Sequence, residues 1–180
     1  MKTDIDYTEQ DLLDCQLFIA SKSEIVKRTR RVTFMRVTGL CFFCAVVFFI
    51  GESKLLMYYC IAMGIISLLF YPTYQRRFYK RHYNKFVANK YKSLTDLDYR
   101  IEITSDAILT TSKLGDGNIK TSQIEDITET NIYFFLKLST GDTLTLPKRS
   151  FNTQDLNEQL VSIAAANNFS VNRELDWQWK

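Results

Sequence analysis

Residues 37–71 read VTGLCFFCAVVFFIGESKLLMYYCIAMGIISLLFY, and this stretch decides the fold. Its only charged residues, Glu52 and Lys54, stand together in the tetrapeptide GESK near the middle. Two apolar runs joined by a short polar turn are typical of an antiparallel helical hairpin. Because a helix rises about 1.5 Å per residue, about 20 residues cross a bilayer core of about 30 Å, and residues 55–71 reach the lower limit alone. The pattern predicts two transmembrane helices.

The first apolar run, residues 37–50, is short for a bilayer span. Phe34, Met35 and the aliphatic stem of a snorkelling Arg36 lengthen it. Runs of about 10 to 14 apolar residues also occur as buried helices of soluble proteins. Here, however, both runs are apolar on every face, whereas a helix of a soluble protein keeps a polar stripe. This difference, together with the dense positive charge on both flanks, favours a membrane hairpin over a buried one.

Charge divides the chain into three zones. Residues 1–21 have a net charge of −4 and residues 93–180 a net charge of −5. Between them, residues 22–92 carry 14 lysines and arginines against two glutamates, a net charge of +12. The basic residues therefore flank the hairpin at both outer ends, while its turn is neutral. The positive-inside rule then predicts a multi-pass membrane protein with both termini in the cytoplasm and the GESK turn outside.

Residues 72–96 form a basic segment after the second span, where a cytoplasmic helix or linker is predicted. Clustered cations beside a span attract anionic lipid headgroups, by about 1 kcal/mol per residue near the surface. The candidate headgroup-binding residues here are Arg76, Arg77, Lys80 and Arg81. The alternative is that the run only sets topology and, with its interleaved aromatic residues, forms an ordinary interfacial belt. No nucleic-acid-binding motif accompanies the charge, so no nucleic-acid partner is expected.

Residues 1–31 are predicted to form an amphipathic and basic helical segment. Thr8 is a suitable N-cap, with acidic residues in the turn that follows. The predicted apolar face consists of Leu12, Leu13, Leu17 and Ala20, together with Gln16. Because its polar face is acidic, this helix is expected to pack on protein and not on anionic lipid. Ser21 and Glu24 fit a capping box that begins the next helix.

Residues 97–180 change in character, because short β-branched and aromatic segments replace the long apolar runs. Five strands are predicted, over residues 99–104, 107–112, 122–130, 131–139 and 143–146. The polar LGDGN segment at residues 114–118 is predicted to be a turn. Short connections between strands indicate an antiparallel meander or a small barrel.

A helix follows the predicted strands. Asn152 or Thr153 is its expected N-cap, and it runs to about Ala166. Its apolar stripe consists of Leu156, Leu160, Ile163 and Ala164. The whole chain is therefore predicted to be an α+β membrane protein, in which a two-helix transmembrane hairpin at residues 32–71 precedes a small antiparallel β domain capped by a C-terminal helix.

Lys148 and Arg149 follow the last predicted strand, close to the N-terminus of this helix, where an anion is favoured. They are a candidate contact for an anionic headgroup or an acidic partner, and the alternative is a solvated linker pair. Near the C-terminus, Trp177 and Trp179 stand two residues apart, so an extended tail points both rings the same way. These rings are predicted to pack against the β domain.

Catalysis requires polar groups that converge in a pocket, and the sequence offers no such set. The single histidine, His82, lies in the basic segment, and no nucleophile-elbow, metalloprotease, P-loop or dinucleotide-binding motif occurs. Cys41 and Cys44 have CxxC spacing, but they lie in an apolar run without the electropositive surroundings that thiolates need. We expect no catalytic residues, no cofactor and no metal site, and therefore no enzymatic activity.

Several strings of this sequence resemble the YcxB-like family of bacterial membrane proteins. They are YTEQDLLDCQLF at residues 7–18, SKSEIVKRTRR at 21–31, ITSDAI at 103–108, QIEDI at 123–127, ETNIYFFLKL at 129–138 and LPKRSF at 146–151. The resemblance implies that residues 97–180 form a cytoplasmic domain similar to the pleckstrin-homology (PH) fold, with a bent antiparallel sheet and a C-terminal helix. It implies no established activity, so it bears on architecture and not on chemistry.

Two functions fit these expectations. The first is a non-enzymatic inner-membrane protein whose PH-like domain binds a protein partner or anionic lipid headgroups. The second is an immunity-type protein that protects the cell from a cognate toxin, suggested by the small size, the nearly loopless hairpin and the lack of catalytic groups. A toxin gene beside this one would favour the second function.

Overall fold

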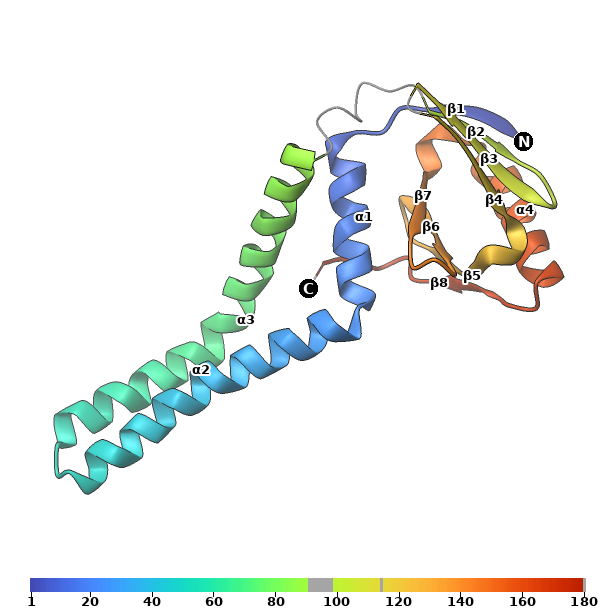
Figure 1. Cartoon of the computed structure of the whole chain (residues 1–180). Coiled ribbons are helices and arrows are strands. Elements are labelled where there is room, and N and C mark those ends of the chain that lie inside the picture. Colours follow the sequence, from blue (N-terminus) through green and yellow to red (C-terminus); the bar gives the residue numbers. More distant parts are fainter. Residues whose placement is uncertain (91–98, 114, 180) are drawn as a thin grey trace. The chain divides into compact units, whose positions relative to one another are not determined.

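The computed structural model describes residues 1–90, 99–113 and 115–179 (Figure 1). The chain divides into two compact units. One unit, termed the sheet unit, combines Met1–Gln16 with Lys85–Gln178. The other, termed the hairpin unit, consists of Leu17–Asn84 with Trp179 from the C-terminal end. The last part of the predicted 72–96 segment, from residue 91, lies outside the described residues.

The hairpin unit is built mainly from two long helices, α2 (Glu24–Ile50) and α3 (Lys54–Lys90). Gly51, Glu52 and Ser53 connect them, with Glu52 in the left-handed region at φ 59°. Both helices are long and apolar enough to cross a membrane. In the most apolar 18-residue stretch of each helix, only 11% is buried in α2 and 6% in α3. The prediction of two candidate spans is therefore confirmed. A buried core helix would hide these side chains, whereas most of the apolar side chains of these two helices are exposed.

Small and polar side chains join α2 to α3 within the hairpin. The hydroxyls of Thr38 and Ser67 lie 3.2 Å apart and form an interhelical hydrogen bond. A Cβ at Gly64 would stand 3.1 Å from the ring of Phe42, so the missing side chain lets this ring approach the helix. Close contact at small residues and hydroxyl pairs is how helices associate where no hydrophobic driving force exists between them.

Helix α2 begins two residues later than the predicted capping box. Its N-cap is Ser23, whose Oγ accepts a hydrogen bond from the Val26 amide. The predicted cap, Ser21, lies inside the preceding helix α1 (Glu9–Lys22), and its hydroxyl donates to the Phe18 carbonyl at 2.7 Å. The prediction failed because two serines, two residues apart, both suit an N-cap, and only the length of α1 decides between them.

Helix α1 begins as predicted after Thr8, whose hydroxyl accepts a hydrogen bond from the Asp11 amide. Leu13, Leu17 and Ala20 are buried, as the apolar spacing indicated. Leu12 and Gln16 are only partly buried, while Asp11, Cys15 and Phe18 are buried as well. The buried face is therefore rotated from the predicted one, and it includes a carboxylate.

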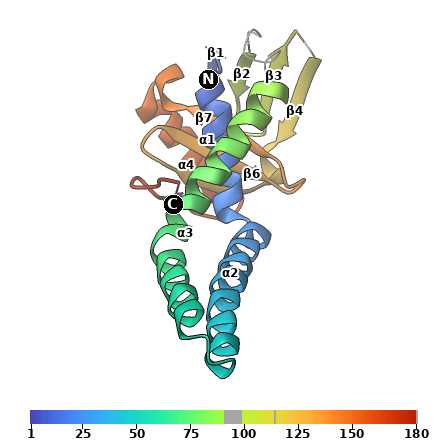
Figure 2. The same cartoon turned by 90° about the vertical axis from the view of Figure 1, so that its left-hand side faces the viewer.

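The sheet unit contains two four-stranded sheets. The first has the strand order β1-β2-β3-β4, and every pair in it is antiparallel. Its strands are β1 (Lys2–Ile5), β2 (Tyr99–Ile103), β3 (Ala107–Ser112) and β4 (Gly115–Lys120). Figures 1 and 2 show β2, β3 and β4 side by side.

The second sheet has the order β7-β6-β5-β8, in which β8 pairs with β5 in parallel. Its strands are β5 (Ile124–Glu129), β6 (Tyr133–Leu138), β7 (Thr143–Pro147) and β8 (Val171–Arg173). Helix α4 (Thr153–Ala166) follows a short 3-10 turn, η2 (Lys148–Ser150). The α+β class, with a small largely antiparallel domain and a C-terminal helix, is confirmed.

The hydrophobic core of the sheet unit receives side chains from both sheets and from α4. Its fully buried members include Ile101, Ile108, Ile127, Phe134, Leu136, Leu146, Leu156 and Leu160. All four residues of the predicted α4 stripe are buried, and Asn152 caps the helix by accepting from the Gln154 amide. Burying a large aliphatic or aromatic side chain contributes about 1.5–3 kcal/mol, so this core supplies the main stabilisation of the unit.

Two further strands of the first sheet were not predicted. Strand β1 pairs with β2, and the Met1 ammonium donates to the Ile103 carbonyl at 2.7 Å. Residue 114 of the predicted turn at 114–118 lies outside the described residues, and residues 115–118 belong instead to the edge strand β4, in which Gly117 pairs with Thr110. A Cβ at Gly117 would stand 2.4 Å from the Thr110 hydroxyl oxygen, so any other residue here would force the Thr110 side chain to move.

Candidate functional site

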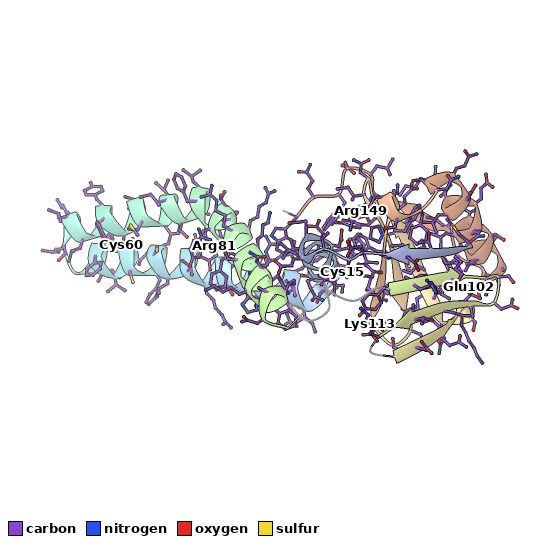
Figure 3. All side chains as sticks on the ribbon, turned by 90° about the horizontal axis from the view of Figure 1, so that it is seen from above. Cys15, Cys60, Arg81, Glu102, Lys113 and Arg149 are labelled. Carbon is purple, nitrogen blue, oxygen red and sulfur yellow. The ribbon has the colours of Figure 1, made fainter. Side chains whose placement is uncertain are left out.

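The six predicted binding residues divide between the two units. Arg76, Arg77, Lys80 and Arg81 lie on α3 in the hairpin unit, while Lys148 and Arg149 lie in η2 of the sheet unit. The side chains of Arg81 and Arg149 are labelled in Figure 3. The structure gives the two groups different surroundings.

The four predicted binding residues on α3, termed the α3 cations, are exposed. Within residues 1–90, 99–113 and 115–179, none of them forms an ion pair. They follow directly after the apolar part of the helix, which continues through Pro72 instead of ending there. Unpaired guanidinium and ammonium groups at this position remain available to an external anion.

Two of these cations line a groove on α3. Its volume is about 350 Å³, and its walls are Phe70, Thr73, Tyr74, Arg77, Phe78 and Arg81. The spacing of three and four residues places all six on one face of the helix. Arg76 and Lys80 are not part of this lining. The groove therefore combines two guanidinium groups with aromatic rings in one continuous stripe.

A separate cluster forms around Arg30 in the hairpin unit. Its guanidinium carbon lies 5.1 Å from the ring centre of Trp179 and 5.8 Å from that of Tyr79. The Trp179 indole donates to the Arg76 carbonyl at 3.1 Å, and the Gln75 amide donates to the Arg30 carbonyl at 3.0 Å. Trp179 is only 6% exposed, so it packs within the hairpin unit, whereas the ring of Trp177 lies in the sheet unit beside Phe135.

Lys148 is largely buried in an internal ion pair. Its ammonium lies 2.7 Å from Glu129, and the side chains of the two residues are 14% and 12% exposed. The same ammonium stands 4.8 Å from the ring centre of Phe134, and Arg173 approaches the second oxygen of Glu129 at 3.2 Å. The Glu129 carboxylate therefore pairs with both Lys148 and Arg173, so Lys148 already has an anionic partner within the protein.

Arg149 is held in the same way by Asp11, whose side chain is 1% exposed. The guanidinium donates to both carboxylate oxygens, one at 2.6 Å, and also to the Asp6 carbonyl at 2.9 Å. Asp11 further accepts hydrogen bonds from the Thr8 amide and hydroxyl and from the Tyr133 hydroxyl. This set of Thr8, Asp11, Tyr133 and Arg149 is termed the Asp11 network.

The Asp11 network changes the acidity of its members. Burial by itself raises the pKa of the Asp11 carboxyl, but the hydrogen bonds from Arg149, Thr8 and Tyr133 outweigh it, and the pKa lies below its ordinary value. Burial, and then the hydrogen bond to Asp11, raise the pKa of the Tyr133 hydroxyl, which stays protonated and donates. The network is thus a stable, ionised structural centre.

The lowered pKa of Asp11 predicts that acid weakens the fold. Because the folded-state pKa lies below the unfolded value of about 3.9, ionised Asp11 stabilises the fold fully above about pH 5, and this contribution is lost as the pH falls through the folded-state pKa. At pH 7 the variant Asp11→Asn should unfold at lower urea than the wild type, and the difference should narrow below about pH 4. A constant difference between pH 7 and pH 3, measured on the full chain in detergent, would contradict this assignment.

The cysteines and metal-binding residue types do not form a site in the described parts of the chain. All four cysteines are free. Burial raises the pKa of the Cys15 thiol, which keeps it protonated and a poor nucleophile. Within residues 1–90, 99–113 and 115–179, no three His, Cys, Asp or Glu side chains gather closely enough to hold a metal ion.

The sequence indicated the α3 cations and the paired residues Lys148 and Arg149, but not their partners. Asp11 and Arg149 are 138 residues apart in the chain, and no local pattern joins them. The helical spacing of the residues in the sequence could have indicated the groove. Arg77 and Arg81 share the helical face of Phe70, Tyr74 and Phe78, whereas Arg76 and Lys80 do not.

Comparison with known proteins adds a family to these observations. No curated protein matches this chain. The family model described as YcxB-like protein matches residues 103–163, from the end of β2 into α4, and confirms the resemblance seen in the sequence. The matched segment contains Glu129 and Lys148 but not the α3 groove. Over residues 103–163, about a third of its length, this chain is similar to the YcxB-like protein family.

Proposed function

We propose that this chain is a non-enzymatic protein of the bacterial inner membrane. Helices α2 and α3 cross the bilayer as a hairpin, and both termini lie in the cytoplasm. The exposed apolar surface of the two helices supports insertion, since such surface is stable only in lipid or against another protein. The basic residues at both outer ends support the orientation by the positive-inside rule.

The sheet unit is, in this proposal, a PH-like domain on the cytoplasmic side. Two four-stranded sheets that share a core with α4 agree with that assignment. Its charged candidates, Lys148 and Arg149, already have internal anions in Glu129 and Asp11. We therefore assign binding of anionic headgroups to the α3 cations and not to the sheet unit.

One observation carries this function. Four exposed cations without ion-pair partners among the described residues follow directly after an exposed apolar helix long enough to span a bilayer. Cations at this depth meet the phosphate layer of the inner leaflet, where anionic lipids concentrate. The function is to anchor the YcxB-like domain and to gather anionic lipid around its anchor.

Two measurements on the full chain test this function. After alkaline carbonate extraction, the expressed protein should remain in the membrane pellet; recovery in the supernatant would contradict insertion. In detergent micelles, the purified chain should bind fluorescent phosphatidylglycerol more tightly than fluorescent phosphatidylcholine.

Replacing Arg76, Arg77, Lys80 and Arg81 together by glutamine should remove this lipid preference. The expected loss is more than about tenfold in affinity for phosphatidylglycerol, because each cation near an anionic surface contributes about 1 kcal/mol. Affinity for phosphatidylcholine should stay unchanged, which serves as the control for folding. Equal binding of the two lipids by the wild type would rule out the proposed headgroup function.

A further inference from the structure

We infer that the groove lined by Phe70, Thr73, Tyr74, Arg77, Phe78 and Arg81 binds one anionic phospholipid, whose phosphate lies between Arg77 and Arg81. This inference deepens the proposed function, on which it rests, by separating a built site from general attraction to the membrane surface. It assigns the binding to Arg77 and Arg81, two of the four predicted binding residues on α3.

The groove follows from the bend at Pro72. Proline removes one backbone hydrogen bond, and its ring clashes with the carbonyl four residues earlier, so a helix bends away from the side of the proline. Figure 1 shows α3 changing direction along its length. An α-helix turns about 100° per residue, so the groove residues centre roughly 170° around the helix from Pro72. The groove therefore lies on the concave face of the bend.

The direction of α3 places its cations well for a phosphate. Side chains of a helix lean toward its N-terminus. In the proposed topology α3 runs from the outer side of the membrane to the cytoplasm, so its N-terminal part lies in the bilayer and its basic part follows on the cytoplasmic side. The long side chains of Arg77 and Arg81 therefore lean back toward the headgroups. Helix α2 runs from the cytoplasm into the membrane, so its N-terminus is in the cytoplasm. Its basic side chains therefore lean away from the bilayer.

The spacing along the helix fits the depth of a headgroup. Arg77 stands seven residues beyond Phe70, or about 10 Å along the axis, and Arg81 one further turn away. The interfacial layer outside the hydrocarbon core is roughly 5–8 Å thick on each side. With its backward lean the Arg77 guanidinium reaches this layer, and the Arg81 guanidinium lies at its cytoplasmic border. A guanidinium donates two parallel hydrogen bonds to a phosphate.

The aromatic side chains favour a lipid over a soluble anion as the occupant. Phe70 is 65% exposed, and the rings of Tyr74 and Phe78 stack at 6.1 Å with 26° between their planes. They continue the apolar surface of the span directly into the pair of arginines. A glycerophospholipid has the same order of parts, with acyl chains, a glycerol and a phosphate, so its apolar end would cover these rings.

The same helix supplies a matched control. Arg76 and Lys80 are also four residues apart, exposed and at the same depth, but they lie on the side of Pro72 and outside the groove. Replacing either pair by glutamine removes two charges. At about 0.15 M salt the Debye length is about 8 Å, so cations that do not touch the phosphate contribute little.

The experiment measures binding of fluorescent phosphatidylglycerol to the full chain in detergent micelles at this salt concentration. Arg77→Gln/Arg81→Gln should lose about tenfold or more in affinity, whereas Arg76→Gln/Lys80→Gln should lose less than about threefold. Tyr74→Ala/Phe78→Ala, which keeps all four cations, should also weaken binding. Circular dichroism of each variant confirms that the helices are intact.

Each outcome decides between a built site and a diffuse one. Equal losses for the two charge pairs would overturn the groove but leave the proposed headgroup function standing. No loss for either pair, or for all four cations, would overturn both. Displacement of the lipid by millimolar inorganic phosphate would also overturn the inference, because the groove would then recognise free phosphate.

Discussion

Replacing Asp11 with alanine should lower the free energy of unfolding of the sheet unit by about 3 kcal/mol. The carboxylate is 1% exposed and accepts hydrogen bonds from Arg149, Tyr133 and Thr8. Without it, the Tyr133 hydroxyl keeps only the Asp14 carboxylate, 3.1 Å away, as an acceptor, and the guanidinium keeps only the Asp6 carbonyl, so the buried ion pair is lost. Removing one partner of a buried charged pair costs about 3–5 kcal/mol, and the half-exposed Arg149 places this case at the low end.

Urea unfolding of the full chain in detergent, followed by tryptophan fluorescence, measures this loss. Trp177 lies beside Phe135 and so reports on the sheet unit. Asp4→Ala is the matched control, since Asp4 also pairs with an arginine, Arg100, but at an exposed site; its loss should be much smaller. In a double-mutant cycle, Asp11→Ala and Arg149→Ala should together cost less than their sum. Additive losses would mean that the two residues do not act as a pair.

Local sequence patterns predicted those elements whose stabilising contacts are close in the chain. The hairpin follows from two apolar runs and a polar turn, and α4 follows from the Asn152 cap and the leucines four residues apart. Strands β2, β3, β5, β6 and β7 follow from short β-branched or aromatic segments between turns. In each of these elements the residue types prefer the structure that forms.

The two missed strands of the first sheet have different causes. Strand β1 is only four residues long, and β2, its partner, is nearly one hundred residues away. Strand β4 contains Gly115, Gly117 and Asp116, which favour turns, and it forms because β3 offers an adjacent edge. A pattern within a window of ten residues cannot show the pairing of β1 with β2. The pairing of β4 with β3 does begin within such a window, at Ser112 and Gly115, and it was missed because the residue types of β4 favour a turn.

Local sequence patterns also identified some residues of the candidate site but not the contacts they make. Clustered positive charge identified Arg77 and Arg81, although it did not separate them from Arg76 and Lys80. That separation needs the helical phase relative to Pro72, which is present in the sequence but meaningful only once α3 is known to continue through the proline. The internal anions of Lys148 and Arg149 could not be found, because Glu129 and Asp11 reach them only through the packing of the sheet unit.

Replacing Glu129 with alanine should cost about 2 kcal/mol of folding stability. Lys148, 14% exposed, would keep its charge above the ring of Phe134 but lose the carboxylate 2.7 Å away. Arg173 would lose its partner as well, although its side chain is 63% exposed and can be hydrated. The remaining cation–π contact offsets part of the cost, which places the loss below the range for fully buried pairs.

Glu125 on the same strand provides the control for this prediction. It pairs with Lys137 at the same 2.7 Å, but both side chains are about half exposed, so Glu125→Ala should cost only about 0.5 kcal/mol. Equal losses at Glu129 and Glu125 in urea unfolding would contradict an internal role for Lys148. If Glu129→Ala costs more stability than Glu125→Ala, weak lipid binding by a Lys148 variant would be explained by its lower folding stability. Only the α3 variants would then test contact with headgroups.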